Sequence, residues 1–177
     1  AGLPLSGKST LGHRLSKDLG IHFVDIDDGP VKCAPPREDD PYQTDESLTR
    51  ERRRMIIAYS VLHSAVAANL ENDLSLIVSA TYSRHTAQDF LSATVERYGG
   101  DLKFLLCQFN DTDDEIERRV NDRLSRGAIG GCRSVSHYLA DRARFAGIKF
   151  PHLVVNMDDG VNGLNQILTK VIHFLEK

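Results

Sequence analysis

The sequence has few cysteines, no long apolar run and no excess of positive charge. Cys33, Cys107 and Cys132 form no C-x-x-C pair and have no histidine at metal-ligand spacing, so neither a disulfide framework nor a zinc site is indicated. No segment has the ~18 apolar residues that a membrane-crossing helix needs. The formal net charge of -3 argues against a nucleic-acid partner. We therefore expect a cytoplasmic protein with structural cysteines and no membrane partner.

The length and composition fit a single domain. With 177 residues, 41% hydrophobic and 27% charged, the chain is long enough to bury one substantial core and ordinary for a globular protein. We expect residues 1–177 to form one domain.

A phosphate-binding pattern stands at the start of the sequence. The spacing G-x-x-x-x-G-K-[ST] is matched by consecutive residues: Gly2, Leu3, Pro4, Leu5, Ser6, Gly7, Lys8, Ser9 and Thr10. The glycines let the backbone fold closely around anionic oxygens, and the lysine places a positive charge on terminal phosphates. The serine hydroxyl can reach Mg²⁺, and the helix that begins here points its positive end at the same anion. The pattern predicts nucleotide binding.

Such a loop normally follows a buried strand, but no strand-like run stands before Gly2 in the sequence. We expect that a first strand precedes Ala1 and anchors the loop.

Apolar periodicity predicts that helices and strands alternate along the chain. The expected strands are 21–24, 74–78, 102–109 and 152–156. The first expected helix is 8–19, and the second is a long helix that Thr44 or Asp45 can cap and that reaches Leu70. The third is 85–98, and the fourth begins at a capping box of Thr112 and Glu115 and buries Ile116, Val120 and Leu124. The last two are 136–146 and a closing helix with apolar residues from Val161 to Leu175. This order predicts an α/β fold of three layers, with a central parallel sheet covered by helices on both faces.

Two acids end the first predicted strand. In an extended segment Asp25 and Asp27 point to the same side, and the carboxyl ends of parallel strands are where open α/β sheets bind ligands. The alternative is that these acids only end a strand and cap the next turn. At the end of the next strand stands Ser79, where many phosphate-loop enzymes have an aspartate for magnesium.

Arginines follow at several helix starts and faces. Arg53 in the second helix and Arg84 before the third are candidates for substrate contact. Arg123 and Arg126 precede a glycine-rich stretch and are favoured over Arg118 and Arg119 as residues of a flap around 118–136. The alternative is an exposed basic helix with i,i+4 partners such as Glu115. The proline-rich segment 29–45 is a second candidate lid.

Three motifs together resemble those of small phosphate-loop kinases: residues 2–10, 23–28 and 78–81. The second motif with Ser79 and Ala80 is similar to gluconate kinases, and its acidic pair is similar to that of shikimate kinases. The C-terminal half resembles predicted kinases related to zeta toxins and chloramphenicol phosphotransferase, in that Arg123 and Arg126 precede Ser134, and Arg144-Phe145 precede Pro151-His152. Ser79 departs from the acid that is usual in the last group, and no gluconate-kinase lid pattern is evident.

The resemblance implies a kinase that transfers the γ-phosphoryl group of ATP, with Mg²⁺, to a hydroxyl of a small molecule such as a sugar acid, a nucleoside or nucleotide, or an antibiotic. The resemblance and the residue chemistry assign these roles: Lys8 binds the phosphates, and Ser9 and Asp25 bind the metal. Asp27, preferred over Asp25, orients or deprotonates the acceptor hydroxyl, and Arg123 or Arg126 closes over the transition state. The residues expected to bind the acceptor are Asp25, Asp27, Arg53 and Arg84.

Other classes stay open. A GTPase switch is disfavoured because no N-K-x-D segment for guanine occurs, and a polynucleotide end kinase is disfavoured by the acidic balance. An ATPase, or a nucleotide sensor without catalysis, remains an alternative because Ser79 replaces an acid. The sequence leaves the acceptor and the oligomeric state open.

Overall fold

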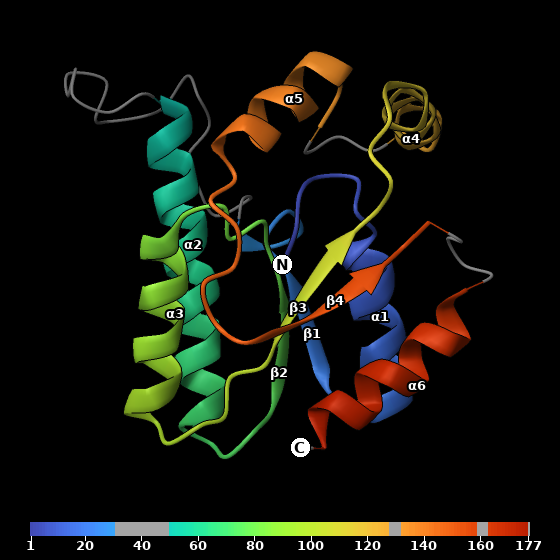
Figure 1. The fold of residues 1–177 in the computed structure, drawn as a ribbon. Helices are drawn as coiled ribbons and strands as arrows, with labels where there is room; N and C mark the ends of the chain where they lie inside the picture. The colour runs from blue at the N-terminus through green and yellow to red at the C-terminus, as the bar shows by residue number, and fades with distance from the viewer. Residues whose placement is uncertain (31–49, 128–131, 159–162, 177) are drawn as a thin grey trace.

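The structure is a computed structural model that describes residues 1–30, 50–127, 132–158 and 163–176 (Figure 1). Helices and strands alternate along these residues. The strands are β1 (His22–Asp25), β2 (Leu76–Ser79), β3 (Phe104–Gln108) and β4 (His152–Asn156). The helices are α1 (Lys8–Leu19), α2 (Arg50–Leu70), α3 (His85–Arg97), α4 (Asp113–Ser125), α5 (Val135–Arg144) and α6 (Leu164–Leu175).

The predicted order of elements is confirmed, and α1 and β4 have the predicted bounds. Gly20 ends α1 in the left-handed conformation, with a φ of 67°, as its position after the helix predicts. The second strand begins two residues later than expected, at Leu76, because the N–H of Leu74 bonds to the carbonyl oxygen of Asn69 and continues the end of α2. Most of the candidate lid 29–45, Cys33 and part of the flap 118–136 lie outside the described residues.

The strands pair in parallel, as predicted, but as two separate pairs. The ladder of β1 and β2 runs from His22 with Leu76 to Asp25 with Ser79. The ladder of β3 and β4 runs from Phe104 opposite His152 to Gln108 opposite Asn156. The first two residues of the chain lie between the pairs: Ala1 bonds to Leu105 and Cys107 on one side, and Gly2 bonds to Thr81 on the other.

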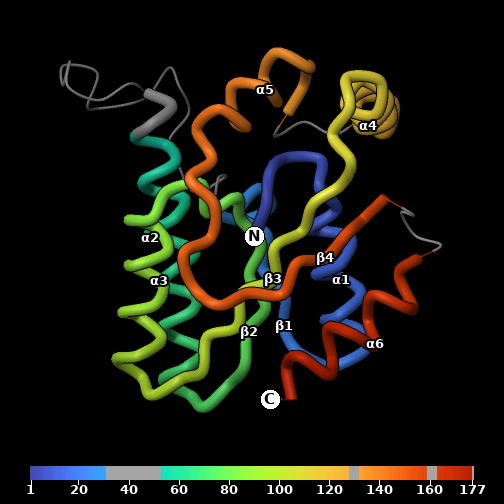
Figure 2. Tube along the Cα trace, in the orientation of Figure 1, coloured from blue at the N-terminus to red at the C-terminus, as the bar shows by residue number. Residues whose placement is uncertain are grey.

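Helices cover both faces of the strands (Figure 2). On one face, α2 and α3 pack Leu62, Val66, Leu91 and Val95 against β2 and Phe104 of β3. On the other, α1 and α6 bury aliphatic side chains, among them Leu11 and Leu168, against β3 and β4. The predicted three layers are thus present, and α4 and α5 lie beyond the carboxyl ends of β3 and β4 (Figure 1). None of the helices in the described parts is both long and apolar enough to cross a membrane.

The contact of α1 with β1 depends on a glycine. A Cβ on Gly12 would lie 2.2 Å from Cε2 of Phe23, whose ring stacks edge-on with His13 at 4.7 Å between centroids. Replacing Gly12 with alanine should lower the free energy of unfolding by about 1–3 kcal/mol, although alanine is the better helix former. Urea unfolding of the Gly12→Ala variant measures this loss.

The matched control is Lys17→Ala on the exposed side of α1, which should change the free energy of unfolding by less than about 0.5 kcal/mol. A Gly12→Ala protein as stable as the native one would contradict the contact.

Candidate active site

The loop before α1 is shaped by backbone conformations that favour glycine. Gly2 and Gly7 have φ values of 134° and 80°, and Leu5 shares the left-handed region at 66°. A Cβ on Gly2 would lie 2.2 Å from the carbonyl oxygen of Cys107, and one on Gly7 would lie 2.8 Å from Cε of Met157. The sequence pattern therefore fits a loop pressed closely against the ends of β3 and β4.

The first turn of α1 is open to an anion. Gly7 is its N-cap and supplies no side-chain bond, while the carbonyl oxygen of Gly7 accepts the N–H of Leu11 at 3.0 Å. The helix dipole places partial positive charge here, and the first N–H groups of a helix have no partner within it. Such a terminus binds phosphate readily.

Lys8 lies folded over this loop. Its Nζ donates a hydrogen bond to the carbonyl oxygen of Leu3 at 2.7 Å. Burial lowers the pKa of Lys8 below its usual value, while the nearby carboxylates of Asp25 and Asp27 raise it and Arg123 lowers it. The charges of both acids and of Arg123 therefore act on the pKa of Lys8.

Asp25 connects the loop to the end of β1. Asp25 is 6% exposed; its Oδ2 accepts a hydrogen bond from the hydroxyl of Ser9 at 2.5 Å, and its Oδ1 accepts one from the N–H of Asp27 at 2.9 Å. The prediction that both acids project from an extended segment is wrong, because β1 ends at Asp25 and Asp27 lies in the turn that follows. The acids are instead brought together by this hydrogen bond.

Asp27 is the exposed acid of the pair. Desolvation and then the like charge of Asp25 raise its pKa above the usual value, while Arg123 and Lys8 lower it. A carboxylate with a raised pKa accepts a proton more readily at neutral pH.

The predicted arginines occupy different places. Arg123, on α4, acts on the pKa of both Lys8 and Asp27. Arg126 forms an exposed ion pair with Asp122 at 2.8 Å. Arg53 is half-buried near the start of α2, and Arg84 is exposed at the N-cap of α3.

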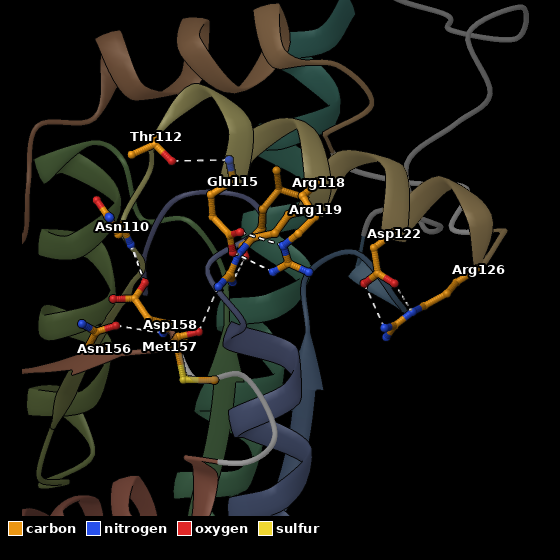
Figure 3. A network of polar contacts seen from close by, with 11 residues as sticks. Asn110, Thr112, Glu115, Arg118, Arg119, Asp122, Arg126, Asn156, Met157 and Asp158 are labelled. Atoms are coloured by element: carbon orange, nitrogen blue, oxygen red, sulfur yellow. Dashed lines mark hydrogen bonds and ion pairs between the residues drawn. The ribbon is translucent and has the colours of Figure 1, made fainter.

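Sequence reasoning ranked Arg119 low, yet it contacts the phosphate loop (Figure 3). Its guanidinium donates to the carbonyl oxygens of Leu5 at 3.1 Å and Met157 at 3.0 Å. It also bonds to Glu115 at 2.6 Å and lies 4.2 Å from the ring centroid of Phe109. The only sequence signal for Arg119 was its i,i+4 spacing from Glu115, which does not predict the contacts with Leu5 and Met157.

The expected capping box forms in one half only. The hydroxyl of Thr112 accepts the N–H of Glu115 at 3.4 Å, but the carboxylate of Glu115 bonds to Arg118 and Arg119 rather than to the N–H of Thr112 (Figure 3). That N–H donates to Asn110 instead. The two guanidinium groups hold the pKa of Glu115 at about 2, because their hydrogen bonds favour the charged carboxylate.

Two buried hydroxyls near the loop have no hydrogen-bond partner among the described residues: Ser6 Oγ and Ser79 Oγ. Ser79 is 4% exposed and pairs with Asp25 across the β1–β2 ladder. In the described ranges, no group of three or more His, Cys, Asp or Glu side chains could hold a metal ion by itself. A cation here would need oxygen atoms from a bound nucleotide or water as well.

An aromatic cluster of Tyr59, His63 and Tyr82 lies between α2 and the segment after β2, and the sequence analysis did not predict it. The hydroxyl of Tyr59 accepts the N–H of Tyr82 at 3.0 Å, and Asp27 contributes to the raised pKa of Tyr59, of about 12, which burial mainly causes. The hydroxyl of Tyr82 meets Nε2 of His63 at 3.2 Å. Burial lowers the pKa of His63 to about 4.

The phosphate loop, parallel strands and covering helices form a P-loop fold, and several of the solved structures that share it are named as kinases. A presumed kinase from Chloroflexus aurantiacus superposes with a TM-score of 0.70 at 19% identity, covering 96% of this chain and 92% of that one. A gluconokinase from Sinorhizobium meliloti gives a TM-score of 0.62 at 16% identity, over 99% and 92% of the chains. An APS kinase from Mycobacterium tuberculosis, in complex with AMPPNP and APS, gives 0.64 at 16% identity, over 100% and 95%. At such identities the likeness is one of fold.

No protein family model matches the sequence, and no curated protein sequence matches it. The structural neighbours alone place the chain among proteins with the small P-loop kinase fold.

The contacts of Arg119 predict that it stabilises the loop. Arg119→Ala should lower the free energy of unfolding by about 1–3 kcal/mol, because the carbonyl groups of Leu5 and Met157 lose a charged donor. Urea unfolding measures the loss. Arg118→Ala is the matched control, because Arg118 shares Glu115 but has a side chain 62% exposed and should change stability by less than about 0.5 kcal/mol. Equal effects of the two changes would contradict the assignment.

The pKa of His63 predicts an acid-dependent loss of stability. Below about pH 6.5 the unfolded chain takes up a proton that the folded protein does not accept until about pH 4, so stability falls as the pH drops through this range. The slope is at most about 1.4 kcal/mol per pH unit for one proton. In urea unfolding between pH 4 and 7, His63→Phe should flatten the slope and His173→Asn, at an exposed position, should not. An unchanged slope in His63→Phe would contradict the prediction.

Proposed function

We propose that the protein is an ATP-dependent kinase that transfers a phosphoryl group to a hydroxyl of a small molecule. The observation that carries this proposal is the meeting of Lys8, Ser9, Asp25 and Asp27 at the start of α1. Transfer of a phosphoryl group to a hydroxyl requires a binding site for the phosphates beside an exposed carboxylate.

The loop and the start of α1 bind the nucleotide phosphates. The first N–H groups of α1, which no side chain caps, donate to the phosphates, and an arriving phosphate replaces the carbonyl of Leu3 as the partner of the Lys8 Nζ. The APS kinase that shares the fold binds AMPPNP, which supports a nucleoside triphosphate as the donor.

Ser9 and Asp25 fit a magnesium ion that arrives with the nucleotide. Both offer oxygen atoms, which Mg²⁺ prefers, and Asp25 is fixed by its bond to the N–H of Asp27. The ion neutralises charge on the phosphates when bound.

Asp27 is the residue that orients and deprotonates the acceptor. The proton leaves the acceptor hydroxyl for the carboxylate of Asp27, the acceptor oxygen bonds to the γ-phosphorus, and the bond to the β-phosphate oxygen breaks to release ADP. Arg123, which already acts on Lys8 and Asp27, balances the charge of the transferred group. Arg126 is a second candidate for this role once its exposed pair with Asp122 opens.

The acceptor is a small polar molecule with a free hydroxyl. Structural neighbours that are named as a gluconokinase, a sugar kinase, an APS kinase and a shikimate kinase support this class without choosing within it. Arg53 and Arg84, at the starts of α2 and α3, are the candidates for binding an acidic group of the acceptor. The free thiols of Cys107 and Cys132 suit a reducing cytoplasm, where ATP is available.

The role of Asp27 predicts the effect of removing its charge. ADP release is measured with ATP, Mg²⁺ and a panel of sugars, sugar acids, nucleosides and antibiotics, first to find the acceptor and then to compare variants. Asp27→Asn should lower acceptor-dependent kcat by about 100-fold or more while the affinity for the ATP analogue changes little.

Asp28→Asn is the matched control, because Asp28 is the neighbouring exposed acid and should keep near-native turnover. A folded Asp27→Asn protein with near-native turnover would contradict the assigned role. ADP release without any acceptor would indicate an ATPase, and nucleotide binding without release would indicate a sensor.

A further inference from the structure

The chain leaves β2 through an irregular turn. The carbonyl oxygen of Ser79 accepts the N–H of Ile26, just beyond β1, at 2.9 Å, whereas the carbonyl oxygen of Thr81 accepts the N–H of Gly2 at 3.3 Å. In a regular strand these two alternate residues would direct their carbonyl groups to the same neighbour. The peptide group that follows Thr81 is therefore turned away from β1 and toward the residue that opens the phosphate loop.

The next residue, Tyr82, has a backbone conformation that bulky residues rarely adopt. Its φ is 50°, and the residue is 2% exposed. A positive φ is unfavourable for a residue of this size and persists only where the surrounding structure determines it, most often near functional sites. The contacts that hold Tyr82 in this conformation therefore bear on the site beside it.

Tyr59, on α2, holds the peptide group between Thr81 and Tyr82. Its hydroxyl accepts the N–H of Tyr82 at 3.0 Å. That N–H and the carbonyl of Thr81 belong to one planar peptide group, in which they point in opposite directions. The hydroxyl of Tyr59 and the N–H of Gly2 therefore bind opposite sides of the same rigid group, and each hydrogen bond polarises the other.

The side chain of Tyr59 is itself fixed in place. Its ring packs edge-on against the ring of Tyr82, with 5.4 Å between the centroids. Ala58 and Leu62, its neighbours on α2, are fully buried in the core that includes Tyr82. Because α2 is anchored in the core on either side of Tyr59, the hydroxyl defines where the N–H of Tyr82 lies.

Gln88, on α3, holds Tyr82 from the other side. This glutamine is 0% exposed, and its Nε2 donates to the carbonyl oxygens of Tyr82 at 2.9 Å and Gly147 at 2.7 Å. Its Oε1 accepts the N–H of Lys149 at 3.0 Å. A buried amide whose nitrogen and oxygen both have partners is fixed in one orientation. The N–H and the carbonyl of Tyr82 are thus both bound by side chains from helices, which maintains its unfavourable φ.

We propose that Tyr59 is a positioning residue for the phosphate loop and acts through the peptide group between Thr81 and Tyr82. Its hydroxyl holds this turned group so that the carbonyl of Thr81 meets the N–H of Gly2, where the loop begins. A pre-organised site binds its ligand more tightly because less ordering is needed when the ligand arrives. The inference rests on the proposed binding of a nucleoside triphosphate by this loop.

The experiment compares Tyr59→Phe with two controls by calorimetric titration with AMPPNP and Mg²⁺. Tyr59→Phe removes only the hydroxyl, and the affinity for AMPPNP should fall by about 10-fold. Val95→Ala lies in the same core but near the carboxyl end of α3, so it should lower the urea midpoint of unfolding and leave the affinity at the native value. Tyr98→Phe, at an exposed position after α3, controls for the change from tyrosine to phenylalanine.

Two NMR measurements test the positioning role directly. Without nucleotide, the amides of Gly7 and Lys8 should shift in Tyr59→Phe and should keep their native positions in Val95→Ala. In the native protein, AMPPNP should shift the amide of Tyr82, because this amide and the N–H of the loop's first glycine bind the same peptide group. This second measurement needs no variant and holds even if Tyr59→Phe does not fold.

Native affinity in Tyr59→Phe would overturn the proposal. An equal loss of affinity in Tyr59→Phe and Val95→Ala would also overturn it, because Tyr59 would then contribute only to stability. So would an amide of Tyr82 that AMPPNP leaves in place while the amides of the phosphate loop shift. A native protein that binds no AMPPNP would contradict the proposed function instead. The spectra without nucleotide would then decide the inference, and unchanged loop amides in Tyr59→Phe would overturn it.

Discussion

The proposed site depends on the two hydrogen bonds that the carboxylate of Asp25 accepts. This carboxylate is buried at the end of β1, yet both of its oxygens have partners: the hydroxyl of Ser9 on one side and the N–H of Asp27 on the other. A buried carboxylate is unfavourable without such donors. Asp25 therefore sets the position of the phosphate loop relative to the turn that presents Asp27.

The loop is held from three directions. Gly2 packs against Cys107, and Gly7 packs against Met157, so closely that a Cβ atom on either glycine would clash. Arg119, on α4, donates a hydrogen bond to the carbonyl oxygen of Leu5. Such contacts pre-organise the backbone donors, so that binding energy is not lost in ordering the loop. The contact of Arg119 also connects the phosphate loop to α4, the helix that carries Arg123. Arg123 therefore lies on an element that packs against the loop.

The sequence predicted the elements well because local signals determine them. The leucines at every fourth residue of α1 and the glycine after it predicted the bounds of that helix. The apolar run of β4 predicted the bounds of that strand. The bond of Ser9 to Asp25 could not be predicted, because it joins two elements through the tertiary fold. Arg118 and Arg119 look alike in sequence, and only the direction in which α4 faces the loop distinguishes them.

The central claim is that the phosphate loop and the side chain of Asp27 belong to one site. The most direct measurement is the pKa of the Asp27 side chain, followed by carbon-13 NMR of its carboxyl group, with and without AMPPNP in the absence of magnesium. Because the bound phosphates add negative charge beside the carboxylate, the pKa of Asp27 should rise further when the nucleotide binds. An Asp27 that titrates identically in both samples, while the amides of Gly7 and Lys8 shift, would show that the two lie apart and would contradict the account.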